Sequence, residues 1–282
     1  MPIRALTLAL TLIALTAAGC ASSKATAPRD TGGHGARAYR HFSDGEIPQA
    51  IAGYKRGYAA ARRADDGTGA ARNLSNIGRA YYELGRPDSA ALYFAKAHEE
   101  FVIYKDEPHA SKTAAFLALC FAKAGDRPQA EHWWNTAITS VNMDNHKSNR
   151  HYYAVIRGQL DFKLTNNISD INALNAAHAF YRKQKNHAML SAIYTLKADA
   201  EFAGGNCAAA DRYLQNALSS NQKTREMYRR SGILLRLSQI SFCDGDERMG
   251  RHYYERARDS APKGATVPPM DEVSLCKTVC RR

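Results

Sequence analysis

The sequence predicts an all-α protein, a solenoid of about six helical hairpins followed by a C-terminal capping helix. The first reason is a glycine that recurs at multiples of 40 residues, at Gly45, Gly85, Gly125, Gly205 and Gly245. Gly125 and Gly205 are separated by two such intervals, which predicts a further turn midway between them, at Thr165. The second reason is composition: 45% hydrophobic and 23% charged residues can build a core, and no apolar run is long enough to span a bilayer.

Each turn is flanked by small and large residues at constant distances. Seven residues before it stand the small residues Ala38, Gly78, Ala118, Gly158, Ala198 and Ser238. Nine residues after it stand the large residues Tyr54, Phe94, Trp134, Leu174, Leu214 and Tyr254, and twelve after it Gly57, Ala97, Ala137, Ala177, Ala217 and Ala257. A spacing of three puts side chains on one helix face. The pattern therefore predicts two antiparallel helices per unit, in which small residues admit bulky neighbours.

The second unit resembles the tetratricopeptide repeat in the pattern Leu74-x-x-Ile77-Gly78-x-x-Tyr81-x-x-x-Gly85-x-x-x-x-Ala90-x-x-x-Phe94-x-x-Ala97. Its period exceeds the usual length of about 34 residues and is similar to that of the repeats of kinesin light chain. HEAT repeats have comparable periods, but the anchor pattern favours the tetratricopeptide resemblance. The resemblance covers residues 36–260. It implies a right-handed superhelix whose inner groove binds peptides or helices of partner proteins.

Repeats four and five depart from this pattern. Charged residues stand where apolar ones are usual, at Arg157, Asp161, Lys197 and Glu201. A better apolar stripe lies one position earlier, at Tyr153, Ile156 and Leu160 and at Ile193, Leu196 and Ala200. The helices of these repeats are therefore expected to be rotated relative to the repeat pattern.

The N-terminus carries a targeting signal. Residues 1–19 have the layout of a secretory signal peptide, and the segment that ends at Cys20 resembles the bacterial lipobox. The resemblance implies that Cys20 carries lipid, and Ala21, where an aspartate would cause inner-membrane retention, implies the outer membrane, facing the periplasm. Residues 20–35 are small and polar, which predicts a flexible tether. An ordinary cleaved signal that releases the protein into the periplasm is the alternative.

The C-terminal segment, residues 261–282, predicts a cap for the last exposed hairpin, with Val273, Cys276 and Cys280 along one side of a short helix. Cys207 opens the second helix of repeat five and Cys243 closes the first helix of repeat six. Since consecutive helices are antiparallel, these ends lie at one level, which predicts a Cys207–Cys243 disulfide in the oxidising compartment. Cys276 and Cys280 either pair together or stay reduced, and Cys120 is expected to be a buried free thiol.

Little in the sequence indicates catalysis. No metal-ligating, nucleotide-binding or serine-nucleophile motif is present, so no cofactor, metal or catalytic residue is expected. Trp134 takes the large core position of its repeat, and Trp133 is expected to pack on a neighbouring helix. The net charge is +12, but it is spread evenly along the mature chain, which argues against nucleic-acid binding.

The tetratricopeptide resemblance implies a ligand groove lined by the first helix of each repeat. Carried onto this chain, its inner-wall positions include Arg72, Arg79, Tyr82, Lys112, Lys123, Tyr152, Gln159 and Lys163. Cations with tyrosines among them suit an acidic peptide that also offers an apolar side chain. We therefore expect a non-enzymatic scaffold of the cell envelope with a protein or peptide partner. The alternatives are a structural role on peptidoglycan or anionic saccharide, and an enzyme with an unrecognised site.

Overall fold

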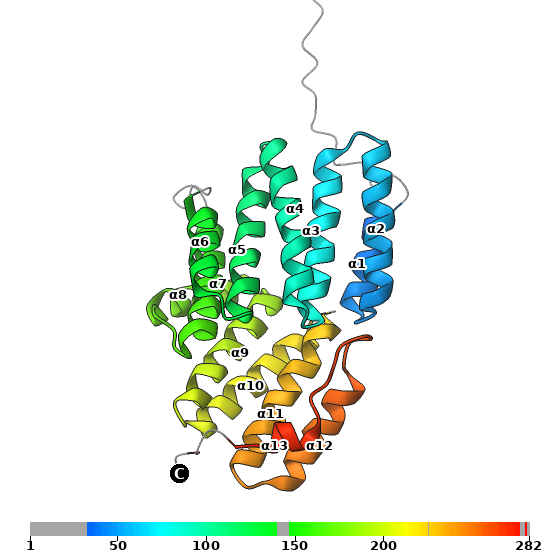
Figure 1. Ribbon diagram of the computed structural model, residues 1–282. Helices are drawn as coiled ribbons and strands as arrows, with labels where there is room; N and C mark the ends of the chain where they lie inside the picture. The colour runs from blue at the N-terminus through cyan, green and yellow to red at the C-terminus, as the bar shows by residue number, and fades with distance from the viewer. Residues whose placement is uncertain (1–32, 140–146, 225, 277–279, 281–282) are drawn as a thin grey trace, which may run out of the picture.

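The structure, a computed structural model, describes residues 33–139, 147–224, 226–276 and 280. Over these ranges the chain is an all-helical solenoid of six antiparallel hairpins, and no β-strand occurs in them (Figure 1). Neighbouring hairpins pack side by side in chain order. The predicted fold class is therefore confirmed.

The hairpins are α1 (His34–Ser43) with α2 (Ile47–Arg63), α3 (Gly67–Glu83) with α4 (Pro87–Ile103), α5 (Glu107–Lys123) with α6 (Arg127–Thr139), α7 (Lys147–Thr165) with α8 (Ile171–Lys183), α9 (His187–Ala203) with α10 (Cys207–Gln222), and α11 (Arg230–Cys243) with α12 (Glu247–Asp259). A short 3-10 turn, η1 (Met227–Arg229), precedes α11, and α13 (Met270–Ser274) follows α12.

The recurring glycines form the turn inside each hairpin. All five have positive φ, between 74° at Gly85 and 88° at Gly245, a conformation that glycine adopts without steric cost. The fourth hairpin has no glycine there, and Asn166 takes the left-handed conformation with φ of 53°. Asparagine tolerates this region better than most residues. The expected turn therefore exists, one residue after Thr165.

About half of the α-helices begin at a residue whose side chain caps them. The side chains of Asp66, Asp106, Asp170, Asn186, Asn206 and Asp246 each accept a hydrogen bond from the backbone N–H three residues later. Each bond satisfies one of the N–H groups that have no partner in a first helical turn. The local sequence thus fixes where these helices start.

The small and large positions pack as the repeat pattern predicts. All six large residues, from Tyr54 to Tyr254, are at most 8% exposed. The fit is tight in repeat two, where a Cβ atom placed on Gly78 would lie 2.9 Å from the ring of Phe94. The small residue therefore lets α3 and α4 approach closely.

In repeat four the apolar stripe lies one position earlier than the pattern, as expected. Tyr153, Ile156 and Leu160 are at most 6% exposed. The two charged residues on the adjacent positions pair, with Arg157 Nε 2.6 Å from Asp161 Oδ1. Asp161 also accepts hydrogen bonds from Ser169 in the turn before α8. Paired charge thus occupies positions that carry apolar residues elsewhere in the solenoid.

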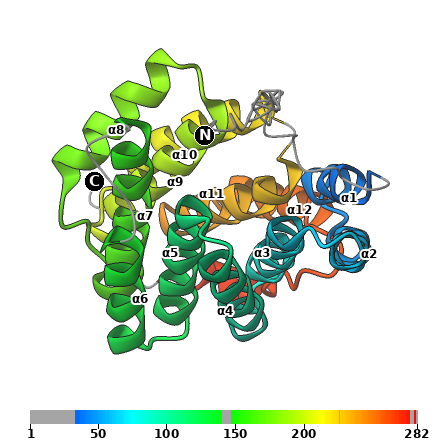
Figure 2. The ribbon, with the colours of Figure 1, turned by 90° about the horizontal axis from the view of Figure 1, so that it is seen from above.

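The solenoid curls until its last hairpin and C-terminal segment reach its first hairpin (Figure 2). The rings of Phe42 in α1 and Tyr228 in η1 lie 4.5 Å apart between centroids. The backbone N–H of Lys263 donates to the carbonyl of Gly45 at 2.9 Å, and its Nζ lies 3.1 Å from Glu46. These contacts turn the inner face of the solenoid into a partly closed cavity.

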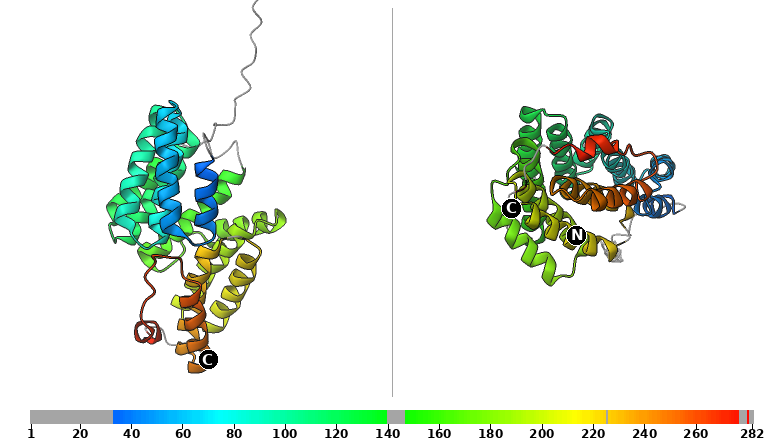
Figure 3. Two further views of the ribbon diagram at one scale, coloured as in Figure 1. Left: turned by 90° about the vertical axis from the view of Figure 1, so that its right-hand side faces the viewer. Right: turned by 90° about the horizontal axis from the view of Figure 1, so that it is seen from below.

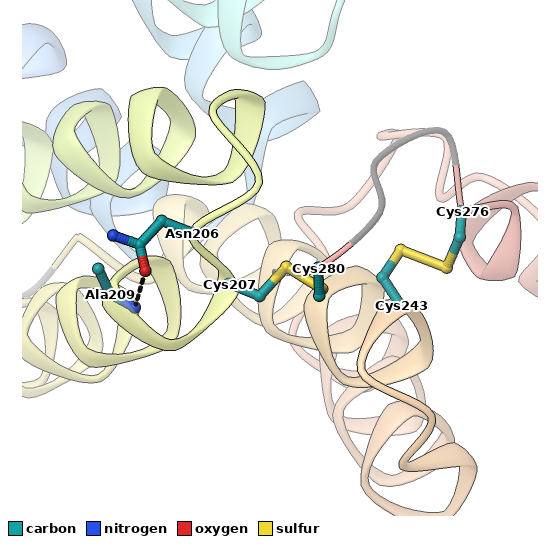
Figure 4. The surroundings of a disulfide bond; sticks show 6 residues. All are labelled: Asn206, Cys207, Ala209, Cys243, Cys276 and Cys280. Carbon is teal, nitrogen blue, oxygen red and sulfur yellow. Dashed lines mark hydrogen bonds between the residues drawn. A yellow bond between two sulfur atoms is a disulfide. The ribbon is translucent and has the colours of Figure 1, made fainter. Parts of the chain in front are cut away.

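The predicted Cys207–Cys243 disulfide is wrong. The structure pairs Cys207 with Cys280 and Cys243 with Cys276 (Figure 4). The start of α10 and the end of α11 do lie close together, but the C-terminal segment passes beside both, and each cysteine bonds to that segment. Four cysteines allow three pairings, and sequence spacing does not select among them.

The C-terminal segment is less helical than the sequence suggested. It leaves α12 beside the first hairpin, then descends to α13, which lies near the end of α11 (Figure 3). Helix α13 ends at Ser274, so Cys276 and Cys280 lie beyond it, although Val273 is buried as a cap requires.

Other expectations from the sequence have mixed outcomes. Cys120 is a free thiol and only 1% exposed, and burial raises its pKa to about 12, as expected for an inert core cysteine. Trp133 packs against His98, with ring centroids 5.3 Å apart. Helix α1 begins at His34, just before the predicted end of the tether, whereas Cys20 and the signal lie outside the described residues. Within the described ranges, no helix is long and apolar enough to cross a membrane.

Candidate functional site

The inner face of the solenoid encloses a cavity of about 760 Å³. The first helices of repeats two to six, α3, α5, α7, α9 and α11, supply most of its lining, and the segment around η1, the C-terminal segment and Phe94 of α4 supply the rest. Seven of the eight predicted groove residues line this one cavity, namely Arg79, Tyr82, Lys112, Lys123, Tyr152, Gln159 and Lys163. The structure thus brings them together, while their role in binding stays a prediction.

Arg72 is the exception, because it does not line the cavity. It lies two helical turns before Arg79 on α3, so the two residues share a helix face but are about 10 Å apart along the axis. The Nε of Arg72 is buried and has no hydrogen-bond partner among the described residues. Arg72 therefore belongs to the packing of its hairpin rather than to the cavity.

Six cationic and three acidic side chains line the cavity. The cations are of two kinds. Arg79, Arg229 and Arg236, which we call the arginine wall, contact carboxylates. Lys112, Lys123 and Lys163, which we call the lysine wall, have no ion pair with any described residue. The uncompensated positive charge of the cavity is thus concentrated on the lysine wall.

The arginine wall ties distant repeats together. Arg79 on α3 donates a 2.7 Å hydrogen bond to the hydroxyl of Tyr228 and lies 3.6 Å from Glu226. Arg229 contacts the same two residues, at 3.2 Å and 3.5 Å. The guanidinium of Arg79 also lies over the ring of Phe42, 5.0 Å from its centroid. This cluster joins repeats one and two to the start of repeat six.

Arg236 on α11 has a partner of its own. Its Nε and Nη2 donate to the two carboxylate oxygens of Asp199 on α9, at 2.6 Å and 3.1 Å. This bidentate geometry is the strong form of an arginine–carboxylate pair. The negative charge of Asp199 raises the pKa of Arg236 although burial opposes it. Repeats five and six are therefore linked by charge at the cavity surface.

The lysine wall lies on α5 and α7 and contacts aromatic rings instead. Lys123 Nζ is 5.3 Å from the ring centroid of Tyr82, and Lys112 Nζ is 5.9 Å from that of Tyr152. All three lysines are exposed to the solvent of the cavity. Lys163 stays in contact with the water of the cavity, but the surrounding walls reduce its hydration, and this partial desolvation, with the charges of Lys123 and Arg236, lowers its pKa. A bound anion would relieve this repulsion.

Tyr82 and Tyr152, the cavity tyrosines beside the lysine wall, are neutral hydrogen-bonding groups. Burial raises the pKa of Tyr82 and, by the same cause, that of Tyr152 above the usual range. Each therefore offers a ring face and a hydroxyl at any physiological pH. Next to lysines, this lining suits a ligand that carries both negative charge and apolar surface.

Sequence reasoning missed the partners of the arginine wall. Glu226 and Tyr228 reach Arg79 only because the chain curls back on itself, and no local pattern marks them. Asp199 stands six residues before Gly205, the repeat position that Arg79 and Gln159 also take, so the repeat pattern could have placed it on the inner wall. Arg229 and Arg236 were noticeable as part of a basic helix face, but nothing in the sequence placed that face beside α3. Among the described residues, no cluster of histidine, cysteine or acidic side chains could hold a metal ion.

Fold and cavity together define a helical-repeat solenoid with a positively charged inner cavity. No known protein family and no curated protein sequence matches this chain. In structure it is similar to the Rap conjugation gene regulator of the plasmid pLS20, solved in complex with the Phr* peptide, with a TM-score of 0.63 and 14% sequence identity. The match covers 80% of this chain and 60% of that one, so this chain spans less than two thirds of the regulator. At this identity the likeness shows the fold.

Proposed function

We propose that this chain is a non-enzymatic scaffold that binds an anionic segment of a partner protein or peptide in its inner cavity. The observation that carries the proposal is the lysine wall: three cations on two adjacent helices, none of them paired with a described carboxylate. The similar Rap regulator was solved with a peptide, which supports a peptide ligand for this fold.

The cavity has the properties that such a ligand requires. Its lysines lie on helices, so their backbone positions are fixed before binding and only the side chains become ordered on association. A hydrogen bond between a lysine and a carboxylate contributes about 1.5 to 3 kcal/mol. Two such contacts that remain partly solvated would still change affinity at least tenfold. The enclosed shape also shields the contacts from salt.

The test uses the mature protein and a fluorescein-labelled peptide of aspartate and glutamate with one central phenylalanine, followed by fluorescence anisotropy. Lys123→Gln combined with Lys163→Gln should raise the Kd at least tenfold and leave the melting midpoint unchanged or higher. The matched control is Lys55→Gln combined with Lys183→Gln, because these exposed lysines lie on second helices outside the cavity. Equal affinity of both double variants would refute the proposal. Binding of soluble peptidoglycan fragments in place of the peptide would instead indicate a structural role on peptidoglycan.

We propose further that lipid on Cys20 anchors the protein to the cell envelope, at the outer membrane and facing the periplasm. The support is the order of signal, small residues and cysteine in the sequence. Two or more acyl chains give stable anchoring at about 0.8 kcal/mol per buried methylene, so the cavity need not contact the bilayer. Radiolabelled palmitate should enter the protein in its native host, and Cys20→Ser should abolish the labelling and release the protein. Labelling that persists in the variant would contradict the proposal.

A further inference from the structure

A second pocket lies beside the cavity, and its lining combines apolar residues with charged ones, among them Asp199, Arg236 and Glu272. It has a volume of about 650 Å³, and its apolar lining includes Phe162, Phe202, Ala203, Leu235 and Val273. We call it the apolar pocket. Phe162 and Leu235, with the Arg236–Asp199 pair, line both spaces, so the two adjoin each other at these residues. A ligand in the cavity can therefore extend a side chain into the apolar pocket.

The C-terminal segment forms one side of the apolar pocket, through Pro268, Glu272 and Val273. This side is attached to the solenoid at several points. The hydroxyl of Tyr254 donates to the carbonyl of Pro268 at 2.9 Å, and the disulfide of Cys276 to Cys243 follows directly after α13. A helix as short as α13 is not stable alone in water, so these attachments hold it against α11.

The position of the apolar pocket relative to the lysine wall limits what can occupy it. Phe162, which lines the pocket, directly precedes Lys163 of the lysine wall on α7. Residues that are neighbours in an extended peptide lie about 3.5 Å apart. A large apolar residue and the acidic residue beside it could thus reach both sites at once.

We infer that the apolar pocket accepts a large apolar side chain of the bound anionic segment, and that the disulfide-linked C-terminal segment forms the wall that selects it. This inference rests on the proposed function and adds the apolar half of the ligand. The occupant is a polypeptide segment with an aromatic or large aliphatic residue next to acidic ones, since the unpaired lysines lie directly beside the apolar lining.

The test compares two fluorescein-labelled peptides that differ at one residue, Glu-Asp-Phe-Asp-Glu and Glu-Asp-Ser-Asp-Glu, on the mature protein. The wild type should bind the phenylalanine peptide at least tenfold more tightly, because only its ring fills the pocket. Ala203→Trp, at an exposed position in the pocket lining, should lower the affinity for the phenylalanine peptide to that for the serine peptide and leave the latter unchanged. Ala64→Trp, at an exposed position outside both spaces, is the matched control.

A second variant tests the wall itself. Cys276→Ser combined with Cys280→Ser frees the C-terminal segment and should reduce the preference for phenylalanine at least fivefold, while Lys123→Gln combined with Lys163→Gln should weaken both peptides alike. If both peptides bind with equal affinity and the lysine variants weaken both, the inference is wrong and the proposed function stands. If neither peptide binds, both fail. Tight binding of dodecanoate without a phenylalanine preference would make the pocket a lipid site and would also overturn the inference.

Discussion

The lysine wall and the arginine wall line the same cavity and carry the same number of cations, yet they differ in what they contact. Each arginine reaches a carboxylate within 3.6 Å, and two of them also donate to the hydroxyl of Tyr228. Lys112 and Lys123 instead lie over aromatic rings, and all three lysines are exposed to solvent. The difference teaches that a count of positive residues does not locate a binding site. The cations without internal partners are the ones left for a ligand.

The two walls are therefore expected to have different roles, one in stability and one in binding. Removing one partner of a buried, hydrogen-bonded charge pair is costly, because the other charge is left without compensation. The arginine wall is therefore expected to stabilise the curled solenoid. The lysines add like charge to one cavity and have only cation–π contacts with tyrosines to offset it, so their main contribution is expected when an anion is bound.

The largest expected effect is a loss of stability when the disulfide between Cys207 and Cys280 is removed. Cys207→Ala combined with Cys280→Ala opens a loop of 73 residues, and the chain-entropy model assigns such a bond about 4 kcal/mol. The melting midpoint should fall by roughly 10 °C. Circular dichroism melts measure this, with Cys120→Ala as the control that removes an unbonded thiol. A fall no greater than that of the control would show that the closed arrangement does not depend on this disulfide.

The next largest effect distinguishes the contributions of two arginines of α3, Arg79 and Arg72, to stability. Arg79→Ala removes the hydrogen bond to Tyr228 and the ion pair with Glu226, each of which spans repeats two and six. Loss of a charged hydrogen bond of this kind costs about 2 kcal/mol, which corresponds to a fall of roughly 4 to 8 °C in the melting midpoint. Arg72→Ala, outside the cavity on the same helix, should change the midpoint much less. Equal shifts for the two variants would contradict the special role of the arginine wall.

The smallest effect has the opposite sign and belongs to the lysine wall. Burial, with the charges of Lys123 and Arg236, lowers the pKa of Lys163 below its usual value of 10.5, so its charged form costs stability in the native state. That cost is fully present below the native pKa and is lost as the pH rises through that pKa toward 10.5. Lys163→Met should therefore raise the melting midpoint by about 1 to 3 °C at pH 7.

The same gain should shrink in melts recorded between pH 9 and 10.5, and Lys55→Met, at an exposed lysine on α2, should show no gain at either pH. A destabilised Lys163→Met protein at pH 7 would mean that this lysine supports the fold and would remove the contrast between the two walls.

The periodic part of the molecule was predictable from the sequence, because its determinants are local. A turn glycine, a small residue seven positions earlier and a large one nine positions later interact within one hairpin or between neighbouring hairpins. The contact between Gly78 and Phe94 could therefore be predicted from their spacing alone. The inner-wall positions that the tetratricopeptide resemblance implies placed Arg79, Tyr82 and Lys123 on one face. The rotated stripe of repeat four was also visible, since Tyr153 and Leu160 kept the helical spacing.

What the sequence did not predict depends on closure over long distances. Arg79 was expected to be free for a ligand, but Tyr228 and Glu226, about 150 residues later, occupy it. The disulfide partners of Cys207 and Cys243 were missed for a similar reason: the path of the C-terminal segment follows from its packing beside α11 and the first hairpin, and no repeat rule describes it. Both sets of contacts depend on how strongly the solenoid curves from one repeat to the next.

The central claim is that the lysine wall binds the anionic ligand while the arginine wall keeps its internal pairs. A crystal structure of the mature protein with the acidic phenylalanine peptide tests it most directly. We predict peptide carboxylates about 2.8 Å from the Nζ atoms of Lys123 and Lys163, with Arg236 still bound to Asp199 and Arg79 still bound to Tyr228. Carboxylates seated on the arginines with those pairs broken, or a peptide bound outside the cavity, would contradict it.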